Sequence, residues 1–185
     1  SGQFAENVYF GKPCGLMDQM ACSVGGMIHI DFKNPEEPVV EKVPSDFEAY
    51  QYSLCIVDTK ASHADLTDDY AQIPADMKKV AKFFKKNFLR EVPEEEFYNQ
   101  ISAMRGLLGD RPVLRAIHFM EEETRVQKEV DSLKAGDFKE FLELVKESGN
   151  SSFKYLQNVY TTNDLNQQAV SVALAGSERI LGKHG

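Results

Sequence analysis

Residues 77–88 read Met-Lys-Lys-Val-Ala-Lys-Phe-Phe-Lys-Lys-Asn-Phe, and this stretch decides the fold class of the protein. Its apolar residues recur at intervals of three and four, which is the spacing of one face of an α-helix. They are Met77, Val80, Ala81, Phe84 and Phe88. The lysines of the stretch occupy the other face. Because the whole chain is acidic, we interpret them as a solvated helix face rather than a nucleic-acid-binding patch.

The same helical spacing continues to the end of the chain. We expect a helix from Glu94 to about Leu108, and a long helix over residues 110–134 that Asp110 caps. A capping-box variant at Asp137 begins another helix. A last helix is expected over residues 165–181, with Thr162 or Asn163 as its cap.

The first third of the chain has a different pattern. A short helix is predicted over residues 16–24, ended by Gly25-Gly26 as a C-cap pair, and it is followed by strands at 27–32, 39–43 and 50–58. Few strands followed by about five helices indicate an α+β, helix-rich fold with a small antiparallel or mixed sheet. The break at residues 44–46 separates the strand pair from the third strand, so we expect a domain boundary there, with domains 1–45 and 46–185.

The composition narrows the function classes. Acidic residues outnumber basic ones, 29 against 21, so the net charge of −8 disfavours nucleic acid and anionic membranes as partners. No apolar run is long enough to span a bilayer. The cysteines Cys14, Cys22 and Cys55 are odd in number and never form C-x-x-C, so we expect reduced thiols and a cytoplasmic protein. The histidines are scattered, and no metal site is expected.

Gly15 and Asp18 are the first candidates for a binding site. Glycine has no Cβ, so a ligand can approach the backbone at Gly15 closely. Its N–H lies near the start of the expected helix and is free to donate, while the Asp18 carboxylate, three residues on, can face the same polar ligand. The alternative interpretation is that Asp18 is only a helix cap or a surface charge.

A longer motif surrounds these two residues. It reads Glu6-Asn7-x-x-Phe10-x-x-Pro13-Cys14-Gly15-x-Met17-Asp18-Gln19 and closely resembles the segment of galactokinases that holds the catalytic aspartate. Galactokinases belong to the GHMP family of small-molecule kinases. A second stretch, Asp58-Thr59-x-x-x-His63-x-x-Leu66-x-x-x-Tyr70, is similar to the galactokinase strand end that precedes a tyrosine of the sugar pocket.

The resemblance implies roles for individual residues. Asp18 would be the catalytic base that orients the anomeric hydroxyl of galactose, and Gly15, Asp18 and Tyr70 would bind the sugar. Without the resemblance, Tyr70 would be interpreted as a half-buried tyrosine that anchors a helix start. His63 is expected to be structural and receives no catalytic role. The fold would be that of a GHMP-kinase C-terminal domain over residues 46–185, preceded by the end of the ATP-binding domain over residues 1–45.

Three family motifs are absent from the sequence. They are the Gly-Arg-x-Asn-x-Ile-Gly-Glu-His-x-Asp-Tyr sugar segment, the Gly-Leu-Ser-Ser-Ser loop for the ATP phosphates and a late Gly-rich motif. We therefore expect a fragment whose parent uses galactose, ATP and Mg²⁺. The fragment itself is expected to bind no cofactor or metal, to be inactive alone and to self-associate through unpaired strand edges. The alternatives are a non-catalytic sugar sensor, a kinase for another hexose such as N-acetylgalactosamine, and a short interaction module.

Overall fold

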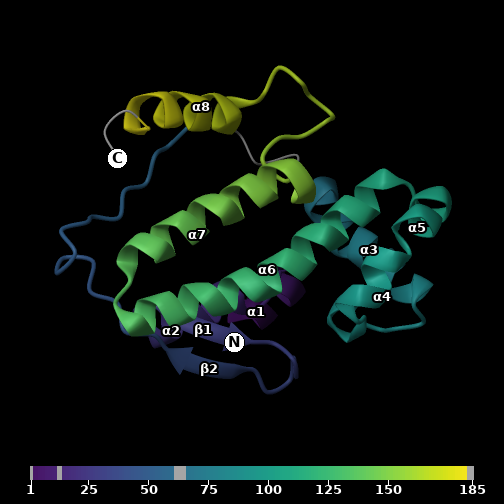
Figure 1. Ribbon diagram of the computed structural model, residues 1–185, viewed down its shortest axis with the longest axis horizontal. Helices are drawn as coiled ribbons and strands as arrows, with labels where there is room; N and C mark the ends of the chain where they lie inside the picture. Colours follow the sequence, from purple (N-terminus) through teal and green to yellow (C-terminus); the bar gives the residue numbers. More distant parts are fainter. Residues whose placement is uncertain (1, 12–13, 61–65, 183–185) are drawn as a thin grey trace. The chain divides into compact units, whose positions relative to one another are not determined.

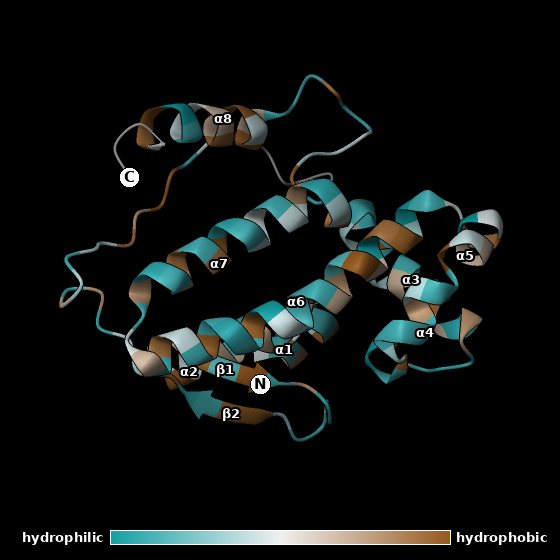
Figure 2. Cartoon of the chain, viewed as in Figure 1, coloured by the Kyte–Doolittle hydropathy of each residue, from teal (hydrophilic) through white to brown (hydrophobic). Residues whose placement is uncertain are grey.

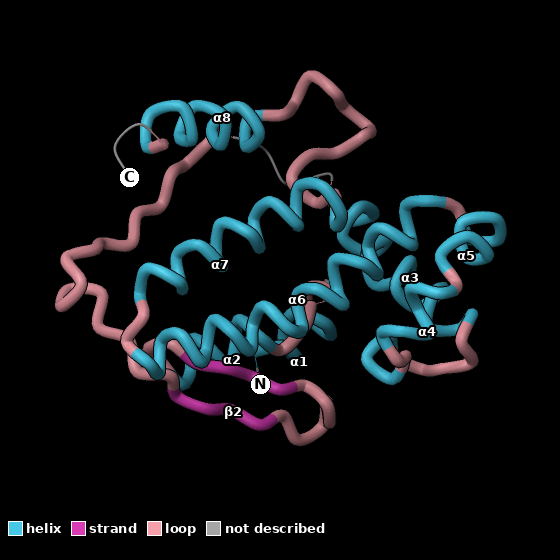
Figure 3. Tube along the Cα trace, in the orientation of Figure 1, coloured by secondary structure: helices cyan, strands magenta, loops and turns pink. Residues whose placement is uncertain are grey.

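The computed structural model describes residues 2–11, 14–60 and 66–182. Within these ranges the chain forms eight α-helices and one two-stranded antiparallel sheet, so the predicted α+β, helix-rich class is confirmed (Figures 1 and 3). The chain divides into two compact units, each described separately below. Unit 1 comprises Ser1–Leu54 and Val126–Leu144, and unit 2 comprises Cys55–Arg125 and Val145–Gly185. The domain boundary at residue 45 stays a prediction.

Unit 1 begins with helical turns and a β-hairpin. The helix α1 (Gly2–Phe4) continues into the π-helical turn η1 (Ala5–Tyr9), and α2 (Met17–Val24) follows. Gly25 ends α2 with φ of 71°, a left-handed value that glycine adopts at little cost, as its place in the sequence predicted. The strands β1 (Ile28–Asp31) and β2 (Val39–Lys42) then pair antiparallel, with Ile28 opposite Lys42.

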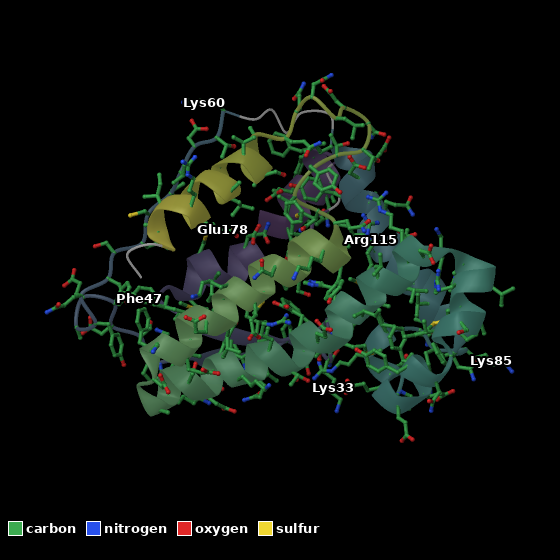
Figure 4. The ribbon with its side chains drawn as sticks, turned by 45° about the horizontal axis from the view of Figure 1, so that its top comes forward. Lys33, Phe47, Lys60, Lys85, Arg115 and Glu178 are labelled. Carbon is green, nitrogen blue, oxygen red and sulfur yellow. The ribbon has the colours of Figure 1, made fainter. Side chains whose placement is uncertain are left out.

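The core of unit 1 forms around Phe138. Two long helices contribute to this unit, namely the second half of α6 (Asp110–Ala135) and the start of α7 (Phe138–Ser151), and the hairpin lies beside α6 (Figure 1). The ring of Phe138 stacks on Tyr50 with ring centroids 4.5 Å apart and also contacts Phe47, which is labelled in Figure 4. Val43, Val130 and Leu133 complete the buried cluster. Burial of these apolar side chains therefore holds the hairpin and the helices together.

The junction between α6 and α7 is set by local hydrogen bonds. Gly136 has φ of 73°, and the N–H groups of Gly136 and Asp137 donate to the carbonyl oxygens of Leu133 and Ser132. This is the Schellman pattern, in which a left-handed residue ends a helix. The Asp137 carboxylate then accepts from the Glu140 N–H at 3.1 Å, which confirms the predicted cap of α7.

Unit 2 is built on α3 (Thr67–Phe83), which carries the stripe of residues 77–88. Val80 and Ala81 are fully buried, as predicted. The helix begins ten residues before Met77 and contains Pro74. Because proline usually breaks a helix, the sequence did not indicate this earlier start. It ends at Phe83, because Lys85, labelled in Figure 4, takes the left-handed φ of 57°. Phe88 is therefore 58% exposed, and its assignment to the buried stripe is wrong.

The remaining helices of unit 2 differ from prediction in two places. The helix expected from Glu94 to Leu108 is two helices, α4 (Glu94–Asn99) and α5 (Ile101–Leu108), because the Gln100 N–H bonds to Phe97 and interrupts the α-helical ladder. Both helices still bury an apolar residue completely, Phe97 and Met104. The first half of α6 packs against this core through Val113 and Ala116. The short 3-10 helix η2 (Leu89–Glu91) contributes Leu89 to the same core.

The last helix of unit 2 begins later than predicted. After α7, the π-helical turn η3 (Ser152–Leu156) ends at Gln157, and α8 covers Ala169–Leu181. The predicted caps Thr162 and Asn163 lie in the preceding loop, where the Asn163 N–H donates to the Thr161 hydroxyl. The N-cap position of α8 is Gln168, which makes no side-chain capping hydrogen bond, so the predicted caps are wrong. A second side-chain turn follows in the same loop, where the Asn166 N–H donates to the Asp164 carboxylate at 3.0 Å.

The predicted third strand at residues 50–58 is absent from the structure. These residues form a turn and then an extended segment without strand pairing, and Figure 2 colours part of this segment brown for its hydrophobic residues. Ile56 and Val57 are 94% and 71% exposed. The apolar run was sufficient for a strand prediction, but a strand forms only against a neighbouring strand, and none pairs with it in the described part of the chain.

Candidate functional site

Gly15 and Asp18 lie together at the start of α2. Asp18 is in the first turn of this helix, and both residues are exposed. The residue before the helix, Leu16, makes no side-chain capping hydrogen bond, so backbone N–H groups of the first turn remain available. Within the described ranges the Asp18 carboxylate has no hydrogen-bond or ion-pair partner. Asp18 is therefore not occupied as a helix cap, and a polar ligand can reach it.

A set of hydrogen bonds holds the segment before α2 against the first helical turns. The backbone N–H of Cys14 donates to Asn7 Oδ1 at 2.9 Å, and its carbonyl oxygen accepts from Gln3 Nε2 at 3.2 Å. Gln19 Nε2 donates to Glu6 Oε1 at 2.9 Å. Glu6 and Asn7 of the sequence motif thus accept hydrogen bonds that hold the segment before α2. The motif alone did not indicate this role. Pro13, another motif residue, lies outside the described residues.

Gly15 is not required by the conformation of the chain itself. The φ angle of Gly15 is not positive, so its backbone is not in the left-handed region. A Cβ added at this position would have no described heavy atom within 4 Å. Neither backbone strain nor packing therefore explains a glycine here. The neighbouring Gly25, by contrast, needs its positive φ to end α2.

Tyr70 lies in unit 2, in the first turn of α3, and its side chain is 61% exposed. The interpretation of Tyr70 as a half-buried anchor of the helix start does not agree with this exposure. This exposure leaves Tyr70 open to a ligand, which is the condition for a sugar contact. His63 of the same sequence motif lies outside the described residues.

A buried charge network in unit 2 escaped the sequence analysis. Arg115 on α6, labelled in Figure 4, is completely buried, and its Nη1 donates to Asp76 Oδ2 on α3 at 2.8 Å. Arg115 Nε also donates to the carbonyl oxygen of Leu156 at 3.1 Å. Asp76 in turn accepts hydrogen bonds from Gln72 and Lys79 at 2.7 Å and 2.8 Å. The network ties α3, α6 and η3 together.

The electrostatics of this network favour a charged Asp76. Burial by itself raises the pKa of this carboxyl, but the hydrogen bonds from Lys79 and Gln72 and the charges of Lys79 and Arg115 lower it below its usual value. The sequence contained no signal for the network beyond the basic residue Arg115 itself. Its partner is 39 residues away, so spacing could not identify it.

His118, one turn further along α6, is a second buried polar residue. Its Nδ1 lies 2.9 Å from the Ser151 hydroxyl, and burial lowers the pKa of the imidazole below its usual value. Glu122 follows on the same helix, accepting a hydrogen bond from Ser148 and pairing with Arg125. These contacts join α6 to α7 within unit 2, and we assign them a structural role.

Several curated galactokinases are similar in sequence to this chain. A galactokinase of Streptomyces coelicolor is 33% identical over 140 residues, which is 73% of this chain and 34% of that protein. A galactokinase of Thermotoga maritima is 30% identical over 178 residues, 96% of this chain and 47% of its own length. One from Glaesserella parasuis is 29% identical over 150 residues, 81% and 38% of the two chains. No protein-family model matches the sequence.

The chain is thus related to galactokinases over most of its length, as the resemblance of its motifs predicted. It spans less than half the length of the curated relatives described here. Among the described helices, none combines the length and apolar character needed to cross a membrane. The described residues also contain no cluster of three or more His, Cys, Asp or Glu side chains able to hold a metal ion.

Proposed function

We propose that this chain, a relative of the galactokinases, is part of an ATP-dependent kinase that phosphorylates the anomeric hydroxyl of galactose. The observation that carries the proposal is the start of α2. There, Gly15 and Asp18 are exposed, and the carboxylate has no partner within the described residues. The Cys14 N–H donates to Asn7 Oδ1, and Gln19 Nε2 donates to Glu6 Oε1, which holds the segment before α2 in place. The relatives named galactokinase support galactose as the substrate.

In this proposal Asp18 acts on the hydroxyl that receives the phosphoryl group. The carboxylate orients the anomeric O–H and accepts its proton as the oxygen attacks the γ-phosphorus of ATP. The bond between the γ-phosphorus and the bridging oxygen breaks, and ADP leaves. Because phosphoryl transfer passes through a loose transition state, orienting the nucleophile matters at least as much as early deprotonation.

Other residues have supporting roles in the proposal. Gly15 lets the sugar approach the backbone, and the exposed Tyr70 contacts the hexose. Mg²⁺ accompanies ATP in kinases of this kind, but the described residues provide no metal cluster, so no step is assigned to the ion here. We also propose that residues 1–45 belong to an ATP-binding domain, that residues 46–185 belong to a second domain, and that the kinase works in the cytoplasm.

The test is the substitution Asp18→Asn in the kinase that contains this sequence. Asparagine keeps the shape and caps a helix about as well as aspartate, but it cannot accept the proton. We expect kcat to fall by about 10² to 10⁴ with little change in galactose binding or in the melting temperature. Asp110→Asn, another exposed aspartate in the first turn of a helix, is the matched control.

Two results would overturn the proposal. Near-normal turnover of the Asp18→Asn protein would show that the carboxylate takes no part in the reaction. A wild-type protein that binds galactose but releases no ADP would be a sensor. A higher kcat/KM for N-acetylgalactosamine than for galactose would support the proposed kinase activity but identify a different sugar as its substrate.

A further inference from the structure

Unit 2 contains a polar pocket of about 370 Å³ that the proposed function does not use. It lies between α3, the start of α6 and the loop before α8. Most of the lining side chains carry hydrogen-bonding groups. The lining residues are Asp68, Asp69, Gln72, Asp76, Lys79, Leu108, Arg111, Pro112, Thr162 and Asn163.

Two of these residues bury a polar atom without a partner. Asp69 Oδ2 and Arg111 Nε are inaccessible to solvent and make no hydrogen bond within the described residues. One atom accepts a hydrogen bond and the other donates one. Buried polar groups are nearly always paired, so two lining residues that each leave one atom unpaired point to a ligand toward which these side chains turn when it binds.

Asp76, another lining residue, is already paired. Asp76 is 2% exposed and receives hydrogen bonds from Gln72, Lys79 and Arg115 at 2.7–2.8 Å. Any of these side chains that turned toward Asp69 or Arg111 would give up its hydrogen bond to the buried Asp76 carboxylate. The unpaired atoms therefore cannot be satisfied by a rearrangement of this network.

The chemistry of the lining selects the class of ligand. Three carboxylates and two cationic groups give the lining a net charge of −1, from −3 and +2. An anion would meet the three carboxylates, and no cluster suited to a metal ion occurs among the described residues. A neutral hydroxyl can donate to Asp69 and accept from Arg111, and the C–H face of a sugar ring can pack on Leu108 and Pro112.

We propose that this pocket binds a neutral polyhydroxylated compound, such as a monosaccharide, with Asp69 as acceptor and Arg111 as donor. Gly15, Asp18 and Tyr70 are not among the lining residues, so the inference does not depend on the proposed kinase activity. The two can fail independently, because they involve different residues.

The experiment is a titration of the ¹⁵N-labelled 185-residue chain with galactose, glucose and myo-inositol, followed by amide chemical shifts. We expect at least one of these compounds to shift the amides of residues 108–111 and of Thr162 and Asn163, with Kd on the order of 1–10 mM. Asp69→Ala and Arg111→Met should each weaken this binding by about fivefold or more. Asp18→Asn and Tyr70→Phe should leave these particular shifts unchanged.

Controls separate the pocket from general effects of charge removal. Glu95→Ala on α4 and Lys78→Met on α3 make the same kinds of change at exposed positions outside the pocket, and should bind as the wild type does. Glycine and inorganic phosphate test for a zwitterion and an anion.

Several results would overturn the proposal. One is the absence of shifts at these amides with any of the three polyols up to about 50 mM, a concentration that would populate a millimolar site almost fully. A second is a response to glycine or phosphate alone. A third is unchanged polyol affinity in folded Asp69→Ala and Arg111→Met proteins. If either variant fails to melt cooperatively, the wild-type titration still decides the question.

Discussion

Arg115 and Asp76 form an ion pair of 2.8 Å between α6 and α3, in which the two side chains are only 1% and 3% exposed. A buried ion pair stabilises a fold less than its Coulomb energy suggests, because both charges lose their hydration. Removing one partner, however, leaves the other charge buried and uncompensated. The packing of α3 against α6 therefore requires that both Arg115 and Asp76 be present.

The first prediction concerns this pair. Arg115→Met should lower the free energy of unfolding by about 3–5 kcal/mol, since Asp76 would remain buried with only Lys79 as a charged partner. The double variant Arg115→Met/Asp76→Leu should recover part of this loss, because no charge is then left unpaired. Urea denaturation of the 185-residue chain measures both values. Arg105→Ala is the control, because its ion pair with Asp110 is exposed and its loss should change stability little. Equal effects of Arg115→Met and Arg105→Ala would contradict the prediction.

The second prediction concerns the pH dependence of stability. Burial lowers the pKa of His118, so between this lowered value and the ordinary value of about 6.5 the unfolded chain binds more protons than the folded chain. The contribution of His118 is thus fully present above pH about 6.5 and is lost as the pH falls toward the lowered pKa. His118→Gln should retain a hydrogen bond to Ser151 and show a shallower fall in melting temperature between pH 7.5 and 5. Identical slopes for the two proteins would refute the role of His118.

The third prediction separates ligand approach from folding at Gly15. The position has an ordinary φ and open space for a Cβ, so Gly15→Ala should leave the chain as stable as before, or stabilise it by about 0.4–1 kcal/mol. In the complete kinase the same methyl group should obstruct the sugar and raise KM for galactose about tenfold or more. Gly106→Ala, on α5 and equally unobstructed, is the matched control and should leave KM unchanged. An unchanged KM in Gly15→Ala would show that no ligand approaches this backbone.

The fourth prediction concerns the extended segment after residue 54. Ile56 and Val57 are 94% and 71% exposed, and an unpaired apolar segment with high β-propensity can pair with a second copy of itself. The 185-residue chain should therefore self-associate with rising concentration in sedimentation velocity, and Ile56→Lys should suppress this association. Val172→Lys, at an exposed apolar position within α8, should have a smaller effect. A chain that stays monomeric at every concentration would count against the prediction.

Part of the site could be predicted from the sequence. The motif at residues 6–19 identified Gly15 and Asp18, and the structure places both, exposed, at the start of one helix. The hydrogen bond from Gln19 to Glu6 was not predicted, because motif spacing does not show which side chains of the motif meet. The pocket with Asp69 and Arg111 gave no signal at all, since its residues come from three separate stretches of the chain.

The sequence by itself determined the features that depend on neighbouring residues. The apolar stripe of α3, the Asp137 cap of α7 and the glycine that ends α2 involve contacts a few residues apart, so periodicity and capping chemistry were enough to predict them. Only the tertiary structure decided that residues 50–58 form no strand and that Arg115 is buried. A strand needs a partner strand and a buried charge needs a counter-charge. Both partners are supplied by distant parts of the chain, which local spacing cannot specify.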